Sequence, residues 1–298
     1  MQLDLLSASK QNALSTQRTV APFKSQLLKW VGNKQRFAHE IVSFFPVKIR
    51  TYYEPFIGSG AILGTLAPAR GVAGDALKPL IEIWQTLTND RQLVVDWYTR
   101  HWNRAQEIGK KEAFEEARQS YNRSPNGADL LFISRTCYGG VLRFRANDGG
   151  ISTPCGAHEP ISPDSFEARA LNWADRVRGT TFIHSDFEAL IEEAGAGDVV
   201  YCDPPYSDSQ SILYGAQRFS LPRLLNAIDR AKTRGATVVL SIDGSKRSGK
   251  HHVPLDIPEG LFEREVYLDC GRSMLKRFQM KGETLEQEMV TDRLLITK

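Results

Sequence analysis

The chain has 298 residues, of which 41% are hydrophobic and 24% charged, which suits one large or two smaller globular domains. Its net charge of +3 permits a nucleic-acid partner without requiring one. No apolar stretch approaches the roughly 20 residues that a membrane helix needs, and the N-terminus, with Asp4 beside a very short apolar patch, does not resemble a signal peptide. We therefore expect a cytoplasmic protein with no membrane partner.

Four cysteines lie far apart in the sequence and form no CxxC pair: Cys137, Cys155, Cys202 and Cys270. This spacing favours free thiols in a reducing compartment over a disulfide framework or a zinc site. We expect no metal cofactor.

The N-terminal part predicts a tail, a helix and two strand–turn–helix units. Residues 1–22 are polar and lack a clear period, which is typical of a loose tail. Residues 26–46, "QLLKWVGNKQRFAHEIVSFFP", favour an amphipathic helix. Residues 51–67 and 71–87 each predict a short strand, a turn and a helix, and the second strand ends at Asp75.

The middle of the chain differs from both ends. Residues 89–130 have a helical pattern. Residues 134–158 place glycine pairs on both sides of "VLRFRA", which predicts a hairpin or an ordered loop. Residues 162–178 again predict a helix. From residue 180 onward strands and helices alternate once more, and the last two strands follow each other without a clear long helix between them.

Strands that alternate with helices at both ends predict an α/β fold with a Rossmann-like, mostly parallel sheet. The closely spaced last strands predict an antiparallel edge on that sheet. The middle is then an insertion. We assign residues 23–88 and 180–298 to one sheet domain and residues 89–179 to the inserted domain.

A glycine turn marks the first candidate ligand site. In "EPFIGSGA", Gly58 and Gly60 follow a predicted strand and open a predicted helix, where glycine lets a ligand approach the backbone. Leu63 stands where a dinucleotide-binding motif has its third glycine, which argues against a dinucleotide cofactor. Asp75, at the end of the next strand, can accept hydrogen bonds from ribose hydroxyls, although capping of the following helix is an alternative role.

The segment "DPPY", Asp203–Tyr206, directly follows the apolar strand "VVYC". An acid at the carboxyl end of a strand in such a sheet faces the ligand crevice. The two prolines lack N–H donors but keep their carbonyl acceptors. The segment therefore predicts a rigid, acceptor-rich clamp for an NH₂ group on a flat ring, with Tyr206 placed to stack. A plain turn after a strand is the alternative.

Four motifs in this order, "LLKWVGNKQRF", "YEPFIGSGA", "GDALKPL" and "YCDPPY", resemble the Dam-type (D12 class) DNA adenine-N6 methyltransferase family. The resemblance runs from about Leu27 to the C-terminus and includes "AFEEARQSYNRS" and "SRTCYGGVLRFRANDGGISTPCG" of the insertion. It implies site-specific methyl transfer from S-adenosyl-L-methionine to adenine N6 in duplex DNA after base flipping. The sheet domain would then be catalytic, and the insertion would recognise the DNA target.

The resemblance also implies roles for single residues. Those matching cofactor-binding positions are Trp30, Lys34, Phe56, Gly58, Gly60, Asp75, Asp186 and Asp203. The catalytic set is Asp203, Pro204 and Tyr206, in which the Asp203 carboxylate and the Pro204 carbonyl accept hydrogen bonds from N6 and Tyr206 stacks on the base. The candidate DNA-binding residues are Arg135, Tyr138, Arg143 and Arg145.

Several alternatives stay open. Pro154–Cys155 matches the nucleophile dipeptide of cytosine C5 methylases, but it lies in the recognition-like loop and is expected to be incidental. The basic segments 244–252 and 272–282 are either phosphate contacts or solvated loops. Methylation of RNA or of a protein amide is the rival activity, and a DNA-binding protein without activity is a third reading. Duplex DNA is the expected partner of a monomer, with or without a cognate restriction endonuclease.

Overall fold

The computed structural model describes residues 18–205, 219–246, 251–252, 257–272 and 289–298. Eight strands form one sheet in the order β3-β2-β1-β4-β5-β8-β7, and the short β6 pairs with β5. The strands are β1 (Tyr52–Glu54), β2 (Gly71–Asp75), β3 (Thr180–His184), β4 (Val199–Cys202), β5 (Thr237–Lys246), β6 (His251–His252), β7 (Arg264–Arg272) and β8 (Met289–Ile296).

The predicted fold class is confirmed. Strands β1 to β5 pair in parallel, and β8 lies antiparallel to both β5 and β7, which gives the expected antiparallel edge. Alternate residues of β4 enter two different cores: Val199 and Tyr201 join one cluster, and Val200 and Cys202 join the other. A strand buried on both faces needs helices on both sides of the sheet.

Helices α9 (Phe187–Glu192) and α10 (Leu221–Thr233) cover one face of the sheet, and their buried side chains form one of these cores. The other core takes in side chains from α2 (Ala38–Ser43), α3 (Ala61–Leu66) and α4 (Lys78–Asn89). Both core clusters are apolar, so burial of side chains on the two faces holds the sheet between its helices.

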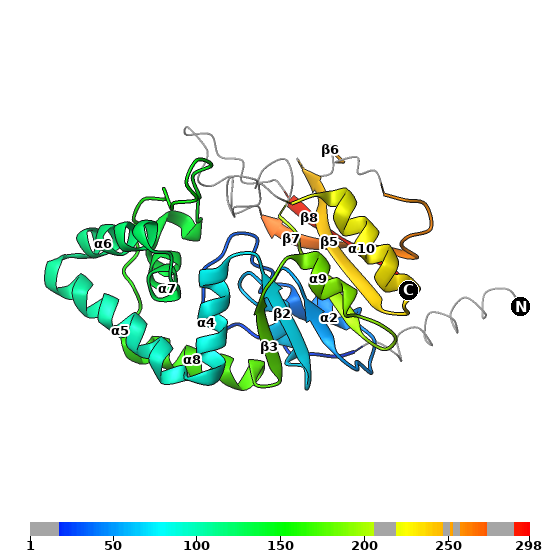
Figure 1. The fold of residues 1–298 in the computed structure, drawn as a ribbon, viewed down its shortest axis with the longest axis horizontal. Coiled ribbons are helices and arrows are strands. Elements are labelled where there is room, and N and C mark those ends of the chain that lie inside the picture. The colour runs from blue at the N-terminus through cyan, green and yellow to red at the C-terminus, as the bar shows by residue number, and fades with distance from the viewer. Residues whose placement is uncertain (1–17, 206–218, 247–250, 253–256, 273–288) are drawn as a thin grey trace, which may run out of the picture.

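The insertion between α4 and β3 is helical. It contains α5 (Arg91–Ile108), α6 (Lys110–Arg123), α7 (Gly127–Thr136), a 3-10 turn η1 (Tyr138–Gly140) and α8 (Pro163–Val177). Figure 1 shows α5, α6 and α7 gathered on one side of the molecule, away from α10 and the antiparallel strands. The segment between η1 and α8 is an ordered loop with two isolated bridges, Phe144 to Ile151 and Cys137 to Cys155, as its glycine pairs predicted.

Two expectations for the N-terminal part need correction. The predicted helix over residues 26–46 is confined to α2, because Gly32 takes a left-handed φ of 75° and the Asn33 side chain accepts a hydrogen bond from the Gln35 backbone at 2.8 Å, which makes a turn. The tail predicted for residues 1–22 lies partly outside the described residues. Within them, Arg18 already donates a 3.1 Å hydrogen bond to the Pro46 carbonyl.

An aromatic contact joins the insertion to the sheet domain at its base. Trp84 of α4 and Trp173 of α8 have ring centroids 5.1 Å apart, and Phe23 meets Trp173 edge-on at 5.0 Å. Gly64 of α3 lies under the same ring. The helix that precedes the insertion and the last helix of the insertion thus meet in one hydrophobic cluster. Among the described residues, no helix combines the length and apolarity needed to span a membrane.

Gly64→Ala tests this packing, because helix propensity and packing predict opposite signs. Alanine favours a helix interior by about 1 kcal/mol over glycine. A Cβ at this position would lie 2.5 Å and 2.6 Å from two atoms of the Trp173 ring. We expect a net loss of about 1–3 kcal/mol in the free energy of unfolding, measured by urea denaturation.

The control repeats Gly64→Ala in a Trp173→Phe variant, because the smaller phenylalanine ring lacks the atoms that would clash. There the loss caused by Gly64→Ala should shrink or change sign. An equal loss in both backgrounds would show that the Trp173 contact does not set the size of this site.

Candidate active site

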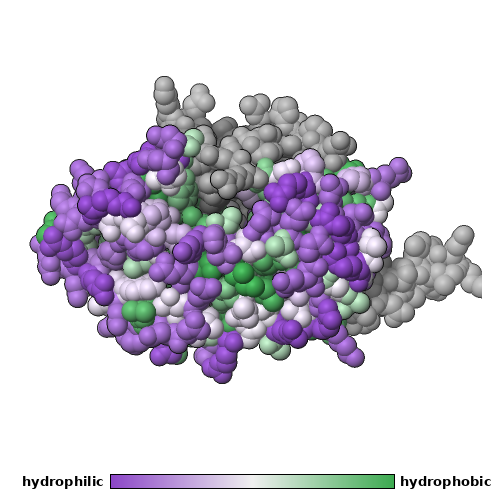
Figure 2. Space-filling model, in the orientation of Figure 1, coloured by the Kyte–Doolittle hydropathy of each residue, from purple (hydrophilic) through white to green (hydrophobic). Residues whose placement is uncertain are grey.

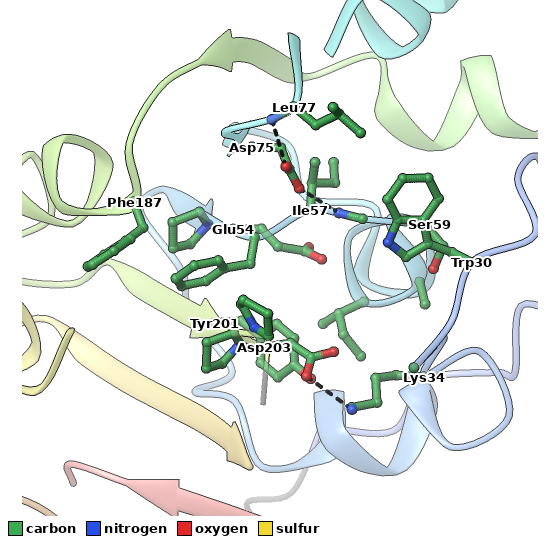
Figure 3. Close-up of a pocket in the computed structure, with 18 of the residues that line it drawn as sticks. Trp30, Lys34, Glu54, Ile57, Ser59, Asp75, Leu77, Phe187, Tyr201 and Asp203 are labelled. Atoms are coloured by element: carbon green, nitrogen blue, oxygen red, sulfur yellow. Dashed lines mark hydrogen bonds and ion pairs between the residues drawn. The ribbon is translucent and has the colours of Figure 1, made fainter. Parts of the chain in front are cut away.

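A cleft opens at the carboxyl ends of β1, β2 and β4, where strand order reverses between β1 and β4. Such a reversal leaves a crevice because the connections on either side run in opposite directions. The cleft is open to solvent. In Figure 2, apolar residues gather in the middle of the face between the helical insertion and the sheet helices. Figure 3 shows the lining residues.

Asp75 lies at one end of the cleft, at the carboxyl end of β2. Its Oδ1 accepts a hydrogen bond from the Leu77 backbone at 3.0 Å, and its Oδ2 accepts one from the Gly58 backbone at 3.3 Å. Burial raises the pKa of this carboxyl to about 6, against the opposing effect of the backbone donors. Asp75 therefore ties the glycine turn to the start of α4 while it lines the cleft.

The two glycines of the turn have different roles. Gly58 lines the cleft with a φ of 46°, and a Cβ there would meet the Trp30 indole at 3.1 Å. Gly60 is not among the described residues that line the cleft; it precedes α3 with a φ of 66° and lies against Trp84 and Trp173. The pattern placed both glycines at the ligand, but the structure assigns Gly60 to the turn and its packing.

Aromatic rings form one wall. Phe56 stacks on Phe187 with centroids 5.2 Å apart, and Phe219 meets Phe56 edge-on at 6.0 Å. Asp186 lines the same side, where its carboxylate caps the Glu188 backbone at 3.0 Å and accepts a 2.9 Å bond from Arg223. This wall presents flat apolar surface with one exposed acid beside it.

Asp203 and Lys34 face each other at the opposite end of the cleft from Asp75 (Figure 3). The Lys34 Nζ lies 3.0 Å from the Asp203 Oδ1, and Pro204 follows Asp203 in the cleft wall. Lys34 is only 6% exposed. Its Nζ also lies 3.4 Å from the Oδ2 of Asp292 on β8, so two carboxylates share one buried ammonium.

Glu54 lies between these two ends and is not one of the site residues predicted from the sequence. It is 2% exposed, lines the cleft and accepts a 2.7 Å hydrogen bond from the Tyr52 hydroxyl. Burial raises the pKa of the Glu54 carboxyl to about 8, with a further contribution from the charge of Asp203. Glu54 is the last residue of a strand, shortly before the glycine turn, and this position was the sequence signal that could have identified it.

The cleft brings together most of the residues predicted to bind a cofactor. Those that line it are Trp30, Lys34, Phe56, Gly58, Asp75, Asp186 and Asp203, and Pro204 joins them. Tyr206 lies outside the described residues. So do the side chains of the basic segments 244–252 and 272–282.

The four predicted DNA-binding residues do not share one environment. Leu142 and Phe144 are buried, while Arg143 between them is exposed. Arg145 is partly exposed and pairs with Asp148 at 2.6 Å. Tyr138 is 43% exposed, so Tyr138, Arg143 and Arg145, three of the four predicted residues, lie on the accessible surface of the insertion.

Arg135 departs from the expectation. It is 5% exposed and donates hydrogen bonds to the carbonyls of Gln26 at 3.1 Å and Leu27 at 2.8 Å. Its guanidinium also lies over the rings of Tyr98 and Phe166. A side chain enclosed in this way is not at the surface, so we leave Arg135 out of the proposed DNA contacts.

Cys155 does not have the environment of a nucleophile. Burial raises its thiol pKa, which favours the unreactive protonated form. It lines a separate surface depression along α6, and it is not among the described residues that line the main cleft. Both observations agree with an incidental Pro154–Cys155 pair.

Comparisons with known proteins agree with the geometry. Residues 30–265 match the family model described as D12 class N6 adenine-specific DNA methyltransferase. The chain is 27% identical over 251 residues to the DNA N-6-adenine-methyltransferase of Escherichia phage P1, which covers 79% of this chain but only 32% of that protein. It is 26% identical over 269 residues to the DNA adenine methylase of Haemophilus influenzae, covering 87% and 86% of the two chains. The chain is also 26% identical over 233 residues to the type II methyltransferase M1.LlaDCHI of Lactococcus lactis, which covers 73% of this chain and 80% of that protein.

Glu54 should make the ligand-free protein less stable as pH rises. Its folded pKa is raised, so the folded state holds a proton that the unfolded state releases, and the stabilising contribution is lost as pH rises toward the folded value. Asp75 is half ionised at about pH 6 and largely ionised by about pH 7, so the window between about pH 7 and about pH 8 reports mainly on Glu54. We expect the free energy of unfolding to fall by roughly 1 kcal/mol across it.

Glu54→Gln should remove this slope, because glutamine keeps the shape and does not titrate. The measurement is urea denaturation at constant ionic strength across the window. An unchanged slope in the variant would assign the pH dependence to other groups.

Proposed function

Because this chain belongs to the D12 class N6 adenine-specific DNA methyltransferase family, we propose that it transfers a methyl group from S-adenosylmethionine to N6 of an adenine in duplex DNA. The cleft carries the proposal: Asp75 at one end and the Asp203–Pro204 segment at the other line a single cavity. A ligand lying along it would meet an acceptor for ribose hydroxyls at one end and an acceptor for an amine at the other.

The lining fits the parts of the methyl donor. Asp75 would accept hydrogen bonds from the ribose hydroxyls, and the adenine ring would lie against Phe56 and Phe187 with Asp186 beside it. The methionine arm would lie near Trp30. When bound, the donor supplies an electrophilic methyl group on a positively charged sulfur.

Asp203 and Pro204 would activate the target amine. The lone pair of adenine N6 is delocalised into the ring, which makes the amine a poor nucleophile. Hydrogen bonds from N6 to the Asp203 carboxylate and the Pro204 carbonyl favour a tetrahedral nitrogen with a localised lone pair. Positioning and electrostatics then carry the catalysis, with direct in-line transfer.

Bonds and charge balance in this reaction. The N6 lone pair forms the new N–C bond while the C–S bond breaks and its electrons stay on sulfur. Positive charge thus passes to N6 until one of its two protons leaves, and the Asp203 carboxylate is the proposed acceptor of that proton. The base must first leave the duplex, and stacking of Tyr206 on it remains a prediction.

The insertion would recognise the DNA. Arg143 is exposed beside two buried neighbours, so its side chain is directed outward from a fixed loop. Arginine can contact guanine through two hydrogen bonds or hold a phosphate. Arg145 and Tyr138 are the further proposed contacts. We propose a cytoplasmic monomer, since one chain carries the whole cleft, and a cognate restriction endonuclease is a proposed partner.

Asp203→Asn should abolish most of the methylation. The amide cannot offer the charged acceptor, so we expect a fall of about a thousandfold in the methylation rate with S-adenosylmethionine affinity kept within about tenfold. The measurement is methylation-aware sequencing of plasmid from a methylase-free host that expresses the parent or the variant. N6-methyladenine at one short motif, absent in the variant, is the expected result.

Asp198→Asn is the matched control, because Asp198 is a buried aspartate that pairs with Arg50 at 2.8 Å and is not among the described residues lining the cleft. It should keep the methylation pattern. A parent that binds S-adenosylmethionine and leaves the plasmid unmodified would exclude DNA adenine as the substrate under these conditions.

Arg143→Ala should weaken cognate DNA binding by about five- to a hundredfold, because one base or phosphate contact is lost. S-adenosylmethionine affinity should not change. Fluorescence anisotropy with a short duplex at fixed salt measures the effect. Arg178→Ala is the control, since Arg178 is also exposed but lies at the end of α8. Equal weakening of DNA binding by both changes would mean that the effect comes from the lost positive charge and not from a specific contact of Arg143.

A further inference from the structure

We call the end of the cleft formed by Asp203, Pro204 and Lys34 the catalytic corner. Asp292, on the antiparallel strand β8, lies behind it. It is 5% exposed and is not among the described residues that line the cleft. Its Oδ2 lies 3.4 Å from the Lys34 Nζ and accepts a 3.0 Å hydrogen bond from the hydroxyl of Ser241, which is fully buried on β5. Asp292 is therefore fixed in place, and its ion pair with Lys34 connects it to the cleft.

This arrangement sets the local charge. In this cluster Lys34 contributes one positive charge, and Asp203 and Asp292 contribute two negative charges. Charges interact strongly here because Lys34 and Asp292 are buried away from the solvent that would screen them. Removal of the Asp292 charge would leave more of the Lys34 positive charge acting on Asp203.

Methyl transfer makes this local charge matter. Positive charge begins on the sulfur of the methyl donor and ends on N6, which Asp203 contacts in the proposed reaction. A neighbouring ammonium whose charge is not offset opposes a cation at both places. A second carboxylate offsets it and also keeps Lys34 from engaging Asp203 alone, so Asp203 stays a strong acceptor.

We propose that Asp292 is a positioning residue of the methyl-transfer reaction, which shares the Lys34 ammonium with Asp203 and so offsets the positive charge of Lys34 beside Asp203. The inference rests on the proposed function, and it extends the catalytic corner to a strand at the opposite end of the sequence from Lys34.

The test separates charge from shape. S-adenosylmethionine carries the sulfonium charge, whereas S-adenosylhomocysteine is its neutral thioether and shares every other part. Asp292→Asn keeps the shape and loses the charge. We expect it to lower the preference for the charged over the neutral ligand, taken as the ratio of their dissociation constants, by about three- to tenfold. Isothermal titration calorimetry measures both constants without catalysis.

The same variant should slow single-turnover methylation by about ten- to a hundredfold, with little change in DNA affinity. The double variant Lys34→Met with Asp292→Asn removes one positive and one negative charge together and leaves that of Asp203. Its ligand preference should return toward that of the parent, although two side chains have changed. It also removes both partners of one buried pair, which guards against a single variant that fails to fold.

Asp198→Asn is the control, as a buried, ion-paired aspartate away from the cleft, and it should leave the ligand preference unchanged. If Asp292→Asn weakens both ligands equally, or if the double variant fails to restore the preference, the role is structural and the inference is overturned. If Asp292→Asn changes the ligand preference as expected but the parent does not methylate adenine, the proposed function is refuted while the inference about charge stands. A parent that binds neither ligand would overturn both.

Discussion

The candidate site depends on one constraint of the sheet, which is the pairing of β1 with β4. Strands β2 and β3 extend the sheet on one side of β1, while β4 and β5 extend it on the other. The register of Tyr52 with Val199 and of Tyr53 with Val200 fixes how far the two strand ends project. Their carboxyl ends therefore meet, close enough that the charge of Asp203 adds to burial in raising the Glu54 pKa.

Buried cations link the parts of the molecule that meet at this point. Among the described residues, Lys34 and Arg135 are the lysine and the arginine with buried side chains. Lys34 lies against Asp203 at one end of the cleft, and Arg135 of α7 binds the carbonyls of Gln26 and Leu27, a few residues before Trp30. The insertion thus holds the N-terminal segment that brings Trp30 and Lys34 to the cleft, so the two domains share one set of polar contacts.

Features that a few adjacent residues determine could be predicted from the sequence. Features that depend on contacts between residues far apart in the sequence could not. The glycine turn, Asp75 and the Asp203–Pro204 segment follow strands directly, so their place at the carboxyl edge follows from the fold class. Asp292 reaches Lys34 only through the antiparallel pairing of β8 with β5, which no local pattern specifies. Arg135 was expected at the DNA from the family resemblance, whereas helix packing turns it inward.

The aromatic contact at the base of the insertion has a consequence for how such proteins diversify. Trp84 and Trp173 meet at 5.1 Å, so the chain leaves the sheet and returns to it at almost the same point. Lengthening a loop between fixed ends costs little, about 0.6 kcal/mol for each doubling. The segment between these two tryptophans can accordingly be exchanged or enlarged during evolution with small effect on the sheet. Under the proposed function, such an exchange would give an unchanged cleft new target sequences, provided that the incoming segment keeps a cation that binds the Gln26 and Leu27 carbonyls as Arg135 does.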